Sequence, residues 1–376
     1  MKKKQQSIGI ITQPIGKAGF GPLSNLLDIV CPLSISTHVI TGNEGMNLLQ
    51  KSSQRIHIYG IRRKYRTNIV TKIITHIHMQ LKISLKLIRL GKKVDTWIFF
   101  LDSHALLLPV IAAKLTRKKI IFALAASLAK SAKAQKDTLA NVSVHSESIN
   151  FKLSNCIILH SPNLIKEWNL EKYRSKIYIA HEYFLDFDKF KIKKKFDDRR
   201  NLVGYVGRLS EEKGVLNFVK AIPDILEKRS EIKFLVGGDG YLQNRIEKYL
   251  EAENLNHKVK LGGWIPHYKL PDYLNGLKLL VIPSYTESGP IIALEAMSCG
   301  TPILATRVGH VLNMVEDGET GFIVENNSPE CIAKGVIRAL NYPNLDEIVK
   351  NARELVEKEF TYEAAVEGYS KILENF

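Results

Sequence analysis

Two glutamates lie eight positions apart in the segment ESGPIIALE, which runs from Glu287 to Glu295. Pro290 suits the first position of a helix, where its missing N–H costs nothing. Backbone N–H groups at the start of a helix form an anion site. The groups concerned here belong to Ser288, Gly289, Ile291 and Ile292. A ligand that places a phosphate at this anion site can also place a hydroxyl-bearing ring beside each carboxylate. A sugar nucleotide has this layout, so we predict a sugar nucleotide as the ligand. The same segment also fits one capping glutamate and one exposed glutamate.

A second group of polar residues lies in GYVGRLSEEKG, residues 204–214. Gly207 allows the backbone to approach a ligand closely, and Arg208 and Lys213 can both reach one anionic group. The alternative is a tight turn followed by a solvated helix face. The turn VGGDG at 236–240 is not the GxGxxG fingerprint, and no acidic residue follows where a dinucleotide ribose requires one, which disfavours a nicotinamide cofactor.

Strands and helices alternate twice along the chain, which predicts two doubly wound parallel sheets. Apolar runs predict strands at 8–12, 36–40, 55–60, 95–101, 119–124, 155–159, 201–207, 232–238, 259–263, 277–283 and 302–306. Helical periodicity predicts helices at 104–116, 140–153, 213–228, 240–254, 267–276 and 290–299. Ligands of such folds bind at the carboxyl ends of the strands, and the polar groups described above follow predicted strands.

The length of 376 residues exceeds what one core usually organises, so two domains are expected. The densely charged stretch 186–200 predicts a linker between a first domain, 1–185, and a second domain, 201–360. No apolar run is long enough to cross a bilayer. The four cysteines lie far apart without a CxxC motif, which indicates reduced thiols in a cytosolic protein and no zinc site.

Positive charge is concentrated in the first half of the chain. Residues 1–200 contain 35 Lys and Arg against 13 Asp and Glu, a balance of +22, whereas the remainder has a balance of −6. We therefore expect the first half to meet an anionic partner, such as membrane headgroups or a phosphorylated lipid. Nucleic acid is not expected, because no recognition motif or aromatic platform accompanies the charge.

Residues 68–93 combine apolar residues at helical spacing with several lysines and arginines. A basic amphipathic helix of this kind can lie on an anionic membrane. It can equally be a core-facing helix with a basic outer face.

Several segments resemble, in order and spacing, the C-terminal domain of the family 4 retaining glycosyltransferases. They are GYVGRLSEEKGV, VGGDG, LGGWIPHYKLPDYLNGLKLLVIPSYTESGPIIALEAMSCGTPILATRVG and VEDGETGFIVEN, and FTYEAAVEGYSKIL resembles the last helix of the family. The resemblance covers residues 200–330 closely and the first 200 residues only in outline. It implies the GT-B fold, in which two Rossmann-like doubly wound parallel-sheet domains face each other across a cleft, with residues 361–376 packed on the first domain.

The resemblance implies a role for each polar residue. Arg208 and Lys213 would neutralise the diphosphate of a UDP- or GDP-sugar as it leaves. Glu287 would contact the donor sugar and Glu295 the ribose hydroxyls. The other implied donor-binding residues are Gly207, Gly238, Gly263, Ser288, Gly289, Pro290 and Ile291.

The family uses neither a metal ion nor a separate cofactor, because the two cations take the place of the metal. The sequence Asp186-Phe-Asp188 matches the DxD motif of metal-dependent glycosyltransferases, but its place in the linker indicates surface charge.

The first domain, which matches the family only in outline, lacks a histidine that is common in the family. Where family members place a histidine at the end of a strand, this chain has Ala125 or Ala126, and His104 in LDSHALLL is the candidate replacement. Three glycines in QPIGKAGFGPLSNLL correspond to a loop that approaches phosphates or the acceptor, although an ordinary turn is the alternative. They are Gly16, Gly19 and Gly21.

We therefore expect a retaining, metal-independent glycosyltransferase that acts on a lipid-linked, polysaccharide or other glycan acceptor. The alternative, suggested by the missing histidine, is a catalytically silent GT-B protein that binds a sugar nucleotide or glycan as a partner subunit. The expected location is the cytoplasm, either free or peripheral on the inner face of the cell membrane.

Overall fold

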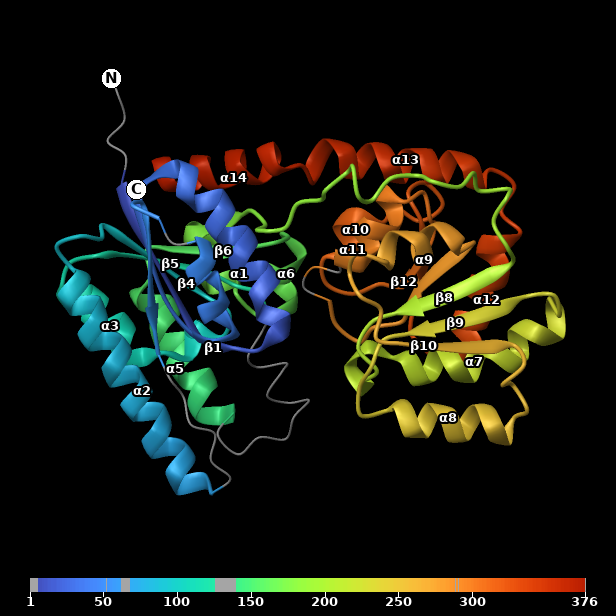
Figure 1. The fold of residues 1–376 in the computed structure, drawn as a ribbon, viewed down its shortest axis with the longest axis horizontal. Helices are drawn as coiled ribbons and strands as arrows, with labels where there is room; N and C mark the ends of the chain where they lie inside the picture. Colours follow the sequence, from blue (N-terminus) through green and yellow to red (C-terminus); the bar gives the residue numbers. More distant parts are fainter. Residues whose placement is uncertain are drawn as a thin grey trace. The chain divides into compact units, whose positions relative to one another are not determined.

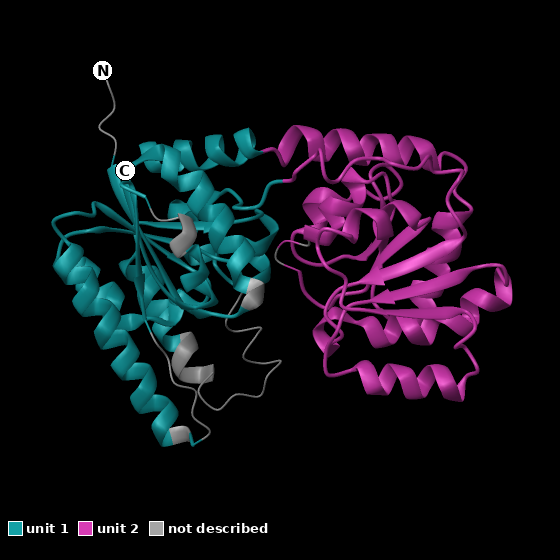
Figure 2. Cartoon of the chain, in the orientation of Figure 1, with its two compact units in different colours: residues 1–184, 362–376 teal, residues 185–361 magenta. Residues whose placement is uncertain are grey.

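The computed structural model describes residues 6–51, 53–61, 68–125, 140–287, 289 and 291–375. The chain divides into two compact units, one of residues 1–184 with 362–376 and one of residues 185–361 (Figure 2). Each unit has its own parallel sheet with helices packed on it (Figure 1), which confirms the predicted fold class. The last helix, α14 (Tyr362–Glu374), belongs to the first unit although it is the C-terminal element.

The first unit contains a seven-stranded sheet of order β3-β2-β1-β4-β5-β6-β7, in which every strand pair is parallel. Its strands are β1 (Gln6–Ile15), β2 (Ser34–Asn43), β3 (Ile56–Gly60), β4 (Thr96–Phe100), β5 (Lys119–Ala123), β6 (Cys156–Leu159) and β7 (Ile177–Ile179). Its other helices are α1 (Lys17–Val30), α2 (Ile69–Leu90), α3 (Leu107–Leu115), α5 (Ala140–Leu153) and α6 (Asn163–Glu167). Short 3-10 turns are η1 (Cys31–Leu33), η2 (Glu44–Lys51), η3 (Ser103–Ala105) and η4 (Glu171–Lys176).

The strand β1 supplies side chains to both faces of this sheet, because successive residues of a strand point in opposite directions. Ile8 and Ile10 belong to the core that buries α1 and α14, whereas Ile11 belongs to the core formed with α2, α3 and α5. Gly9 is paired with Trp97 of β4, and a Cβ at Gly9 would lie 2.1 Å from the Trp97 ring. Glycine is therefore required for β1 and β4 to pack side by side.

The second unit contains a six-stranded parallel sheet of order β10-β9-β8-β11-β12-β13. Its strands are β8 (Leu202–Val206), β9 (Lys233–Gly237), β10 (Val259–Gly263), β11 (Leu279–Ile282), β12 (Ile303–Thr306) and β13 (Phe322–Val324). Its helices are η5 (Glu211–Lys213), α7 (Val215–Lys228), α8 (Gln243–Ala252), α9 (Leu270–Gly276), α10 (Ile291–Ser298), α11 (Val311–Met314), α12 (Pro329–Leu340) and α13 (Leu345–Glu359). Figure 1 shows α7 and α8 on one side of this sheet and α9 and α10 on the other.

The predicted strands are all found, but the sequence analysis missed β7 and β13. Each of these strands is three residues long, with the sequences IYI and FIV. A three-residue apolar run has too few positions to display a strand period. None of the described helices has both the length and the apolar character needed to cross a bilayer.

The charged stretch 186–201 contains no helix or strand and belongs to the second unit. One of its residues, Arg199, is buried and donates hydrogen bonds to Leu277 O (3.1 Å), Thr301 Oγ1 (2.8 Å) and Cys299 O (2.7 Å). A guanidinium presents five donors in a fixed fork, so one side chain joins this stretch to two separate loops of the unit.

The strand β2 contains a buried histidine, His38, which is 3% exposed and stacks on His57 with 4.8 Å between ring centroids. Its Nδ1 lies 3.2 Å from the Tyr59 hydroxyl. Burial lowers the pKa of His38 to about 4, and the charges of His57 and Lys93 act in the same direction. His38 is therefore neutral in the folded protein at pH 7.

We predict that acid destabilises the first unit through His38. Its pKa is 6.5 in the unfolded chain and about 4 in the folded one. Only the unfolded chain gains this proton as the pH falls from 6.5 towards 4, so stability decreases across that window. His38→Gln should shrink the loss of unfolding free energy between pH 7 and pH 5 by about 1–2 kcal/mol.

The measurement is urea unfolding at both pH values, followed by tryptophan fluorescence, since Trp97 and Trp168 both lie in the first unit. His78→Gln, which changes an exposed histidine of the same unit, is the control and should leave the loss unchanged. Equal losses in His38→Gln and the parent protein would contradict the assignment.

Candidate functional site

The second unit gathers its polar loops at one edge because every strand pair of its sheet is parallel. The carboxyl ends of parallel strands lie at the same edge of a sheet. The loops that follow β8, β9, β10 and β11 therefore meet, and they carry most of the residues predicted to bind the donor.

Three of the predicted donor-site glycines, Gly207, Gly238 and Gly263, pack backbone against backbone at this edge. The Gly238 N–H donates to Gly263 O at 2.7 Å, and the Gly207 N–H donates to Gly237 O at 3.0 Å. Gly238 has a φ of +125°, and a Cβ on it would lie 1.8 Å from Gly207 O. A larger residue at position 238 would therefore separate the loops that follow β8 and β9.

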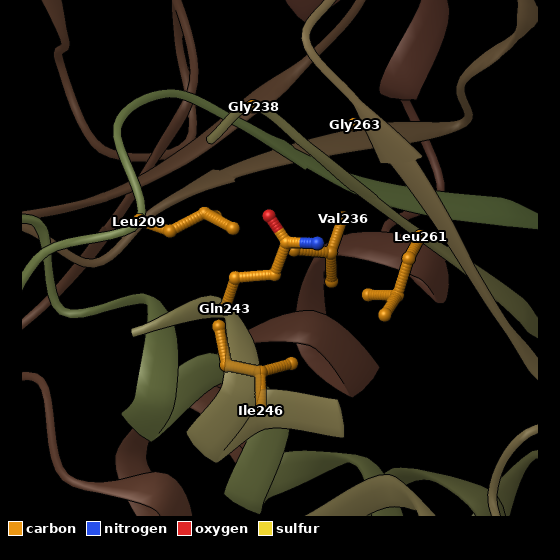
Figure 3. A pocket seen from close by; sticks show the side chains of 7 residues that line it. All are labelled: Leu209, Val236, Gly238, Gln243, Ile246, Leu261 and Gly263. Carbon is orange, nitrogen blue, oxygen red and sulfur yellow. The ribbon is translucent and has the colours of Figure 1, made fainter. Parts of the chain in front are cut away.

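A small hollow lies beside these glycines, between α8 and the strands β9 and β10 (Figure 3). It is lined by Leu209, Val236, Gly238, Gln243, Ile246, Leu261 and Gly263. Figure 3 shows the side-chain amide of Gln243 among apolar side chains of the lining. The next residue after Gly263 is Trp264, which is 71% exposed. Apolar walls, one amide and an exposed indole are groups that can bind a planar base.

Lys213 and Glu287 form an ion pair that joins the loops following β8 and β11. The Lys213 Nζ lies 2.6 Å from Glu287 Oε1, and Ser284 Oγ donates to the same oxygen at 2.7 Å. Glu287 is 7% exposed and Lys213 is 29% exposed. Among the residues that the structure describes, Oε2 of Glu287 accepts no hydrogen bond. One carboxylate oxygen thus fixes the lysine, and the other remains able to accept a hydrogen bond from a ligand.

The backbone of Glu287 is fixed by the loop that follows β12. The His310 N–H donates to Glu287 O at 3.1 Å. Gly309 has a φ of +53°, and a Cβ on it would lie 1.5 Å from the same oxygen. Three loops therefore determine where the Glu287 carboxylate lies.

Arg208 lies on the same loop as Lys213 but is 61% exposed. Its Nη1 is 3.5 Å from Glu212 Oε1, which also accepts a hydrogen bond from Ser210 Oγ at 2.7 Å. The buried Tyr205 hydroxyl donates to Arg208 O at 2.6 Å. Burial, with the charges of Glu287 and Glu212, raises the pKa of Tyr205. The Arg208 backbone is thus anchored while its guanidinium remains accessible to an anion.

Glu295 is buried in α10 and forms part of a chain of three polar side chains. Its Oε1 lies 2.7 Å from Nε2 of His267, whose Nδ1 lies 2.7 Å from Nζ of Lys189. An ammonium group can only donate, so Nδ1 accepts and the Nε2–H donates to Glu295. Burial raises the pKa of Glu295, against the effect of the His267 hydrogen bond. A neutral His267 that is oriented by Lys189 therefore holds the Glu295 carboxylate.

The sequence analysis missed His267 and Lys189. His267 lies inside the segment LGGWIPHY that carries the resemblance, and this was the available signal. Lys189 lies in the charged stretch 186–201, where its position beside His267 depends on how that stretch packs against the unit.

The start of α10 differs in detail from the prediction. Ser288 and Pro290 lie outside the described residues, and the helix begins at Ile291. The Ile291 N–H, one of the predicted anion donors, donates to Gly289 O at 2.9 Å. In this arrangement that group already has an internal partner.

In the first unit, the predicted phosphate or acceptor loop leads into α1. Gly16 is the N-cap residue of that helix, and its carbonyl accepts the Gly19 N–H at 3.0 Å. Gly16 and Gly21 are exposed, and a Cβ on either would meet no atom within 4 Å. The surrounding space therefore does not require glycine at these two positions.

His104, the candidate replacement for the family histidine, is buried in η3. It is 3% exposed, its Nε2 lies 3.7 Å from Glu147 Oε1, and its carbonyl accepts a hydrogen bond from Asn150 at 2.8 Å. Burial lowers the pKa of His104 to about 4, so it is neutral at pH 7. Ala125 is half-buried after β5, and Ala126 lies outside the described residues. The structure thus places the His104 ring within the first unit's interior.

The DxD sequence of residues 186–188 forms a local turn. The Asp186 carboxylate accepts the N–H groups of Asp188 (3.1 Å) and Lys189 (3.0 Å). Across the part of the chain that the structure describes, no three His, Cys, Asp or Glu side chains gather as metal ligands.

Residues 186–356 match the family model of glycosyl transferases group 1. The chain is 30% identical over 201 residues to alpha-D-kanosaminyltransferase of Streptomyces kanamyceticus, covering 52% of each chain. It is 29% identical over 204 residues to the capsular polysaccharide biosynthesis glycosyltransferase CapM of Staphylococcus aureus, covering 51% of this chain and 53% of that protein. These alignments thus span about half the length of the curated relatives.

Solved structures resemble the chain over nearly its whole length. The crystal structure of Anabaena HepE in complex with UDP and glucose has a TM-score of 0.76 and 16% sequence identity, covering 99% of this chain and 100% of that one. A similarity at this identity shows the fold, and it confirms the expected pair of parallel-sheet domains.

We predict that the two cations of the loop 207–213 differ in their effect on stability. Lys213→Ala leaves the buried Glu287 carboxylate without its cation and should lower the unfolding free energy of the second unit by about 2–3 kcal/mol. This loss is smaller than the loss expected for a fully buried ion pair, because Lys213 is partly exposed. Arg208→Ala removes an exposed, distant pair and should change it by about 0.5 kcal/mol or less.

Urea unfolding followed by far-UV circular dichroism measures both effects. The double variant Lys213→Met with Glu287→Gln should be more stable than Lys213→Ala, since no unpaired charge remains buried. If Lys213→Ala and Arg208→Ala unfold at the same urea concentration, the ion pair between Lys213 and Glu287 does not stabilise the second unit, and the prediction is wrong.

Proposed function

Residues 186–356 belong to the glycosyl transferases group 1 family, and from this premise we propose that the protein transfers a sugar from a nucleotide-sugar donor to a glycan acceptor. One observation carries the proposal. Two cations, Arg208 and Lys213, lie on a single loop, and Lys213 is joined to the buried Glu287 at the carboxyl edge of the sheet.

The donor's diphosphate is the ligand that suits the two cations. Arg208 is accessible, and Lys213 is held in place by Glu287, so both can face an anion without reorganising the loop. Fixed cations act most strongly where charge develops as a bond breaks. In the proposed reaction that charge develops on the leaving nucleoside diphosphate.

The two ends of the donor suit the flanking groups. Glu287 Oε2 would accept a hydrogen bond from the sugar, and Glu295 would accept hydrogen bonds from the ribose hydroxyls. The base would lie by the hollow of Figure 3, near Gly263. UDP- and GDP-sugars both have this layout, and the HepE structure contains UDP and glucose.

The reaction breaks the bond between the anomeric carbon and the diphosphate oxygen and forms a bond from that carbon to an acceptor oxygen. The acceptor's proton passes to the leaving phosphate. We propose retention of the anomeric configuration and no metal ion, because Arg208 and Lys213 supply the positive charge that a metal would otherwise provide.

The proposed acceptor is a lipid-linked precursor, a polysaccharide or another glycan. The chain is similar to CapM, whose name refers to capsular polysaccharide biosynthesis. The silent partner subunit remains the second candidate, because the structure places His104 in a buried position.

We predict that a nucleotide-sugar donor protects the protein against thermal unfolding. A panel of UDP- and GDP-sugars, with UDP, GDP and ATP as comparison ligands, should give a rise in Tm for the sugars of one nucleotide. That donor should then be hydrolysed slowly in the presence of EDTA. Protection without hydrolysis or transfer to any acceptor would favour the silent subunit, and no protection by any member would contradict the proposed function.

We predict different kinetic defects at the site. Arg208→Ala should lower kcat by roughly 100-fold or more, because its charge acts on the leaving group, while Lys220→Ala, an exposed lysine of α7, should not. Glu295→Gln and His267→Ala should mainly raise the donor KM, because ribose contacts act equally in ground and transition states. Steady-state kinetics with the protective donor separates these cases, and unchanged kinetics in Arg208→Ala would remove that residue from the mechanism.

A further inference from the structure

The helix α2 exposes a continuous apolar surface. Nineteen large apolar or aromatic side chains of the described residues are exposed, and seven of them lie on this one helix, each 40–61% exposed. They are Val70, Ile73, Ile74, Ile77, Leu81, Leu85 and Ile88, hereafter the α2 stripe. Their spacing of three, four or seven residues places them on one side of the helix. At 1.5 Å per residue the stripe is roughly 27 Å long.

The opposite side of α2 is the one that packs on the sheet. Met79, Ile83, Leu87 and Leu90 are buried in the core shared with α3 and α5. The helix therefore has two apolar sides, and the core accounts for only one of them. A contiguous exposed apolar patch of this kind commonly marks a protein or membrane interaction site.

Basic side chains border the stripe. Lys82 and Arg89 are exposed and lie roughly 100–120° around the helix axis from Ile88. Lys86 lies beyond them, with its Nζ 5.3 Å from the centre of the Tyr59 ring. The helix contains no Asp or Glu, and among the described residues neither Lys82 nor Arg89 has an acidic partner within ion-pair distance.

The net charge of the first unit also indicates an anionic partner. Residues 1–184 and 362–376 contain 29 Lys and Arg against 12 Asp and Glu, a balance of +17, whereas residues 185–361 have a balance of −1. A second copy placed on the stripe would bring two strongly positive units together, which is unfavourable. A surface with an apolar interior and anionic groups at its edge could bury the stripe and also pair with the basic side chains that border it.

We propose that the α2 stripe is a docking surface for an anionic lipid membrane. The helix would lie in the plane of the interface, with the stripe among the acyl chains near the headgroups and Lys82 and Arg89 against lipid phosphates. Apolar area and electrostatic attraction would both be needed, because neither alone gives stable binding of a surface helix.

Co-sedimentation of the full chain with vesicles tests this surface. The protein should bind vesicles of phosphatidylglycerol and phosphatidylcholine and should bind pure phosphatidylcholine at least tenfold less. Binding to the anionic vesicles should weaken as salt rises from 50 to 500 mM, because exposed charges are screened.

Two pairs of variants separate the stripe from its border. Lys82→Ser with Arg89→Ser should lower the partition coefficient at low salt by roughly fivefold for each cation removed. Leu81→Ser with Leu85→Ser should lower it at least tenfold and should do so at high salt as well. Both pairs change exposed side chains, and circular dichroism and Tm check that the fold is kept.

Matched controls lie elsewhere in the chain. Lys220→Ser with Lys248→Ser removes two exposed charges of the second unit, and Ile35→Ser with Ile149→Ser removes two exposed apolar side chains of the first. Both controls should bind vesicles as the parent protein does. Protection by the nucleotide-sugar donor should be unchanged in all four variants, so this result is independent of the proposed function.

Three results of the vesicle experiments would each overturn the proposal. They are equal binding to neutral and anionic vesicles, equal loss of binding in the stripe variants and the controls, and absence of binding at low salt. A dimer in sedimentation equilibrium that Leu81→Ser with Leu85→Ser abolishes would also overturn it, because the stripe would then be an interface between copies of the chain.

Discussion

Parallel pairing of the strands is the constraint on which the candidate site depends. Because β8 and β11 are parallel neighbours, the loops that follow them end at the same edge, and Lys213 meets Glu287 across 74 positions of sequence. An antiparallel neighbour would have sent one of the two loops to the opposite edge. The parallel pairing of β9 with β8 and β10 likewise places Gly238 against Gly207 and Gly263, and at position 238 only glycine leaves room for the backbones to touch.

Burial of two carboxylates determines most of the remaining geometry. A buried carboxylate needs a cation or hydrogen-bond donors, and the two glutamates satisfy this need differently. Glu287 is paired directly with Lys213, whereas Glu295 accepts a hydrogen bond from His267, which Lys189 orients. The Arg208 side chain stays accessible at this edge, which suits it to meet the diphosphate of the proposed donor.

The first unit has a different balance of forces. Its sheet is covered by helices on both faces, yet α2 has more apolar surface than the core can bury, and the unit carries all of the chain's excess positive charge. The proposed membrane surface would therefore be in the first unit and the proposed donor site in the second. This separation explains why variants of one are expected to leave the other intact.

The sequence by itself determined the two-sheet architecture, the strands of four or more residues, and the loop positions of Arg208, Lys213 and Glu287. It could do so because apolar period, glycine placement and helix starts are local properties of the chain. It could not reveal β7 and β13, which are too short to show a period. It also gave no reason to join Lys189, His267 and Glu295, or to bury Arg199 within a charged stretch, since those contacts depend on long-range packing.

For α2, the sequence pattern fitted both a core helix and a membrane-surface helix. Only the tertiary structure decided which apolar residues the core takes up, because burial depends on what packs against each side of the helix.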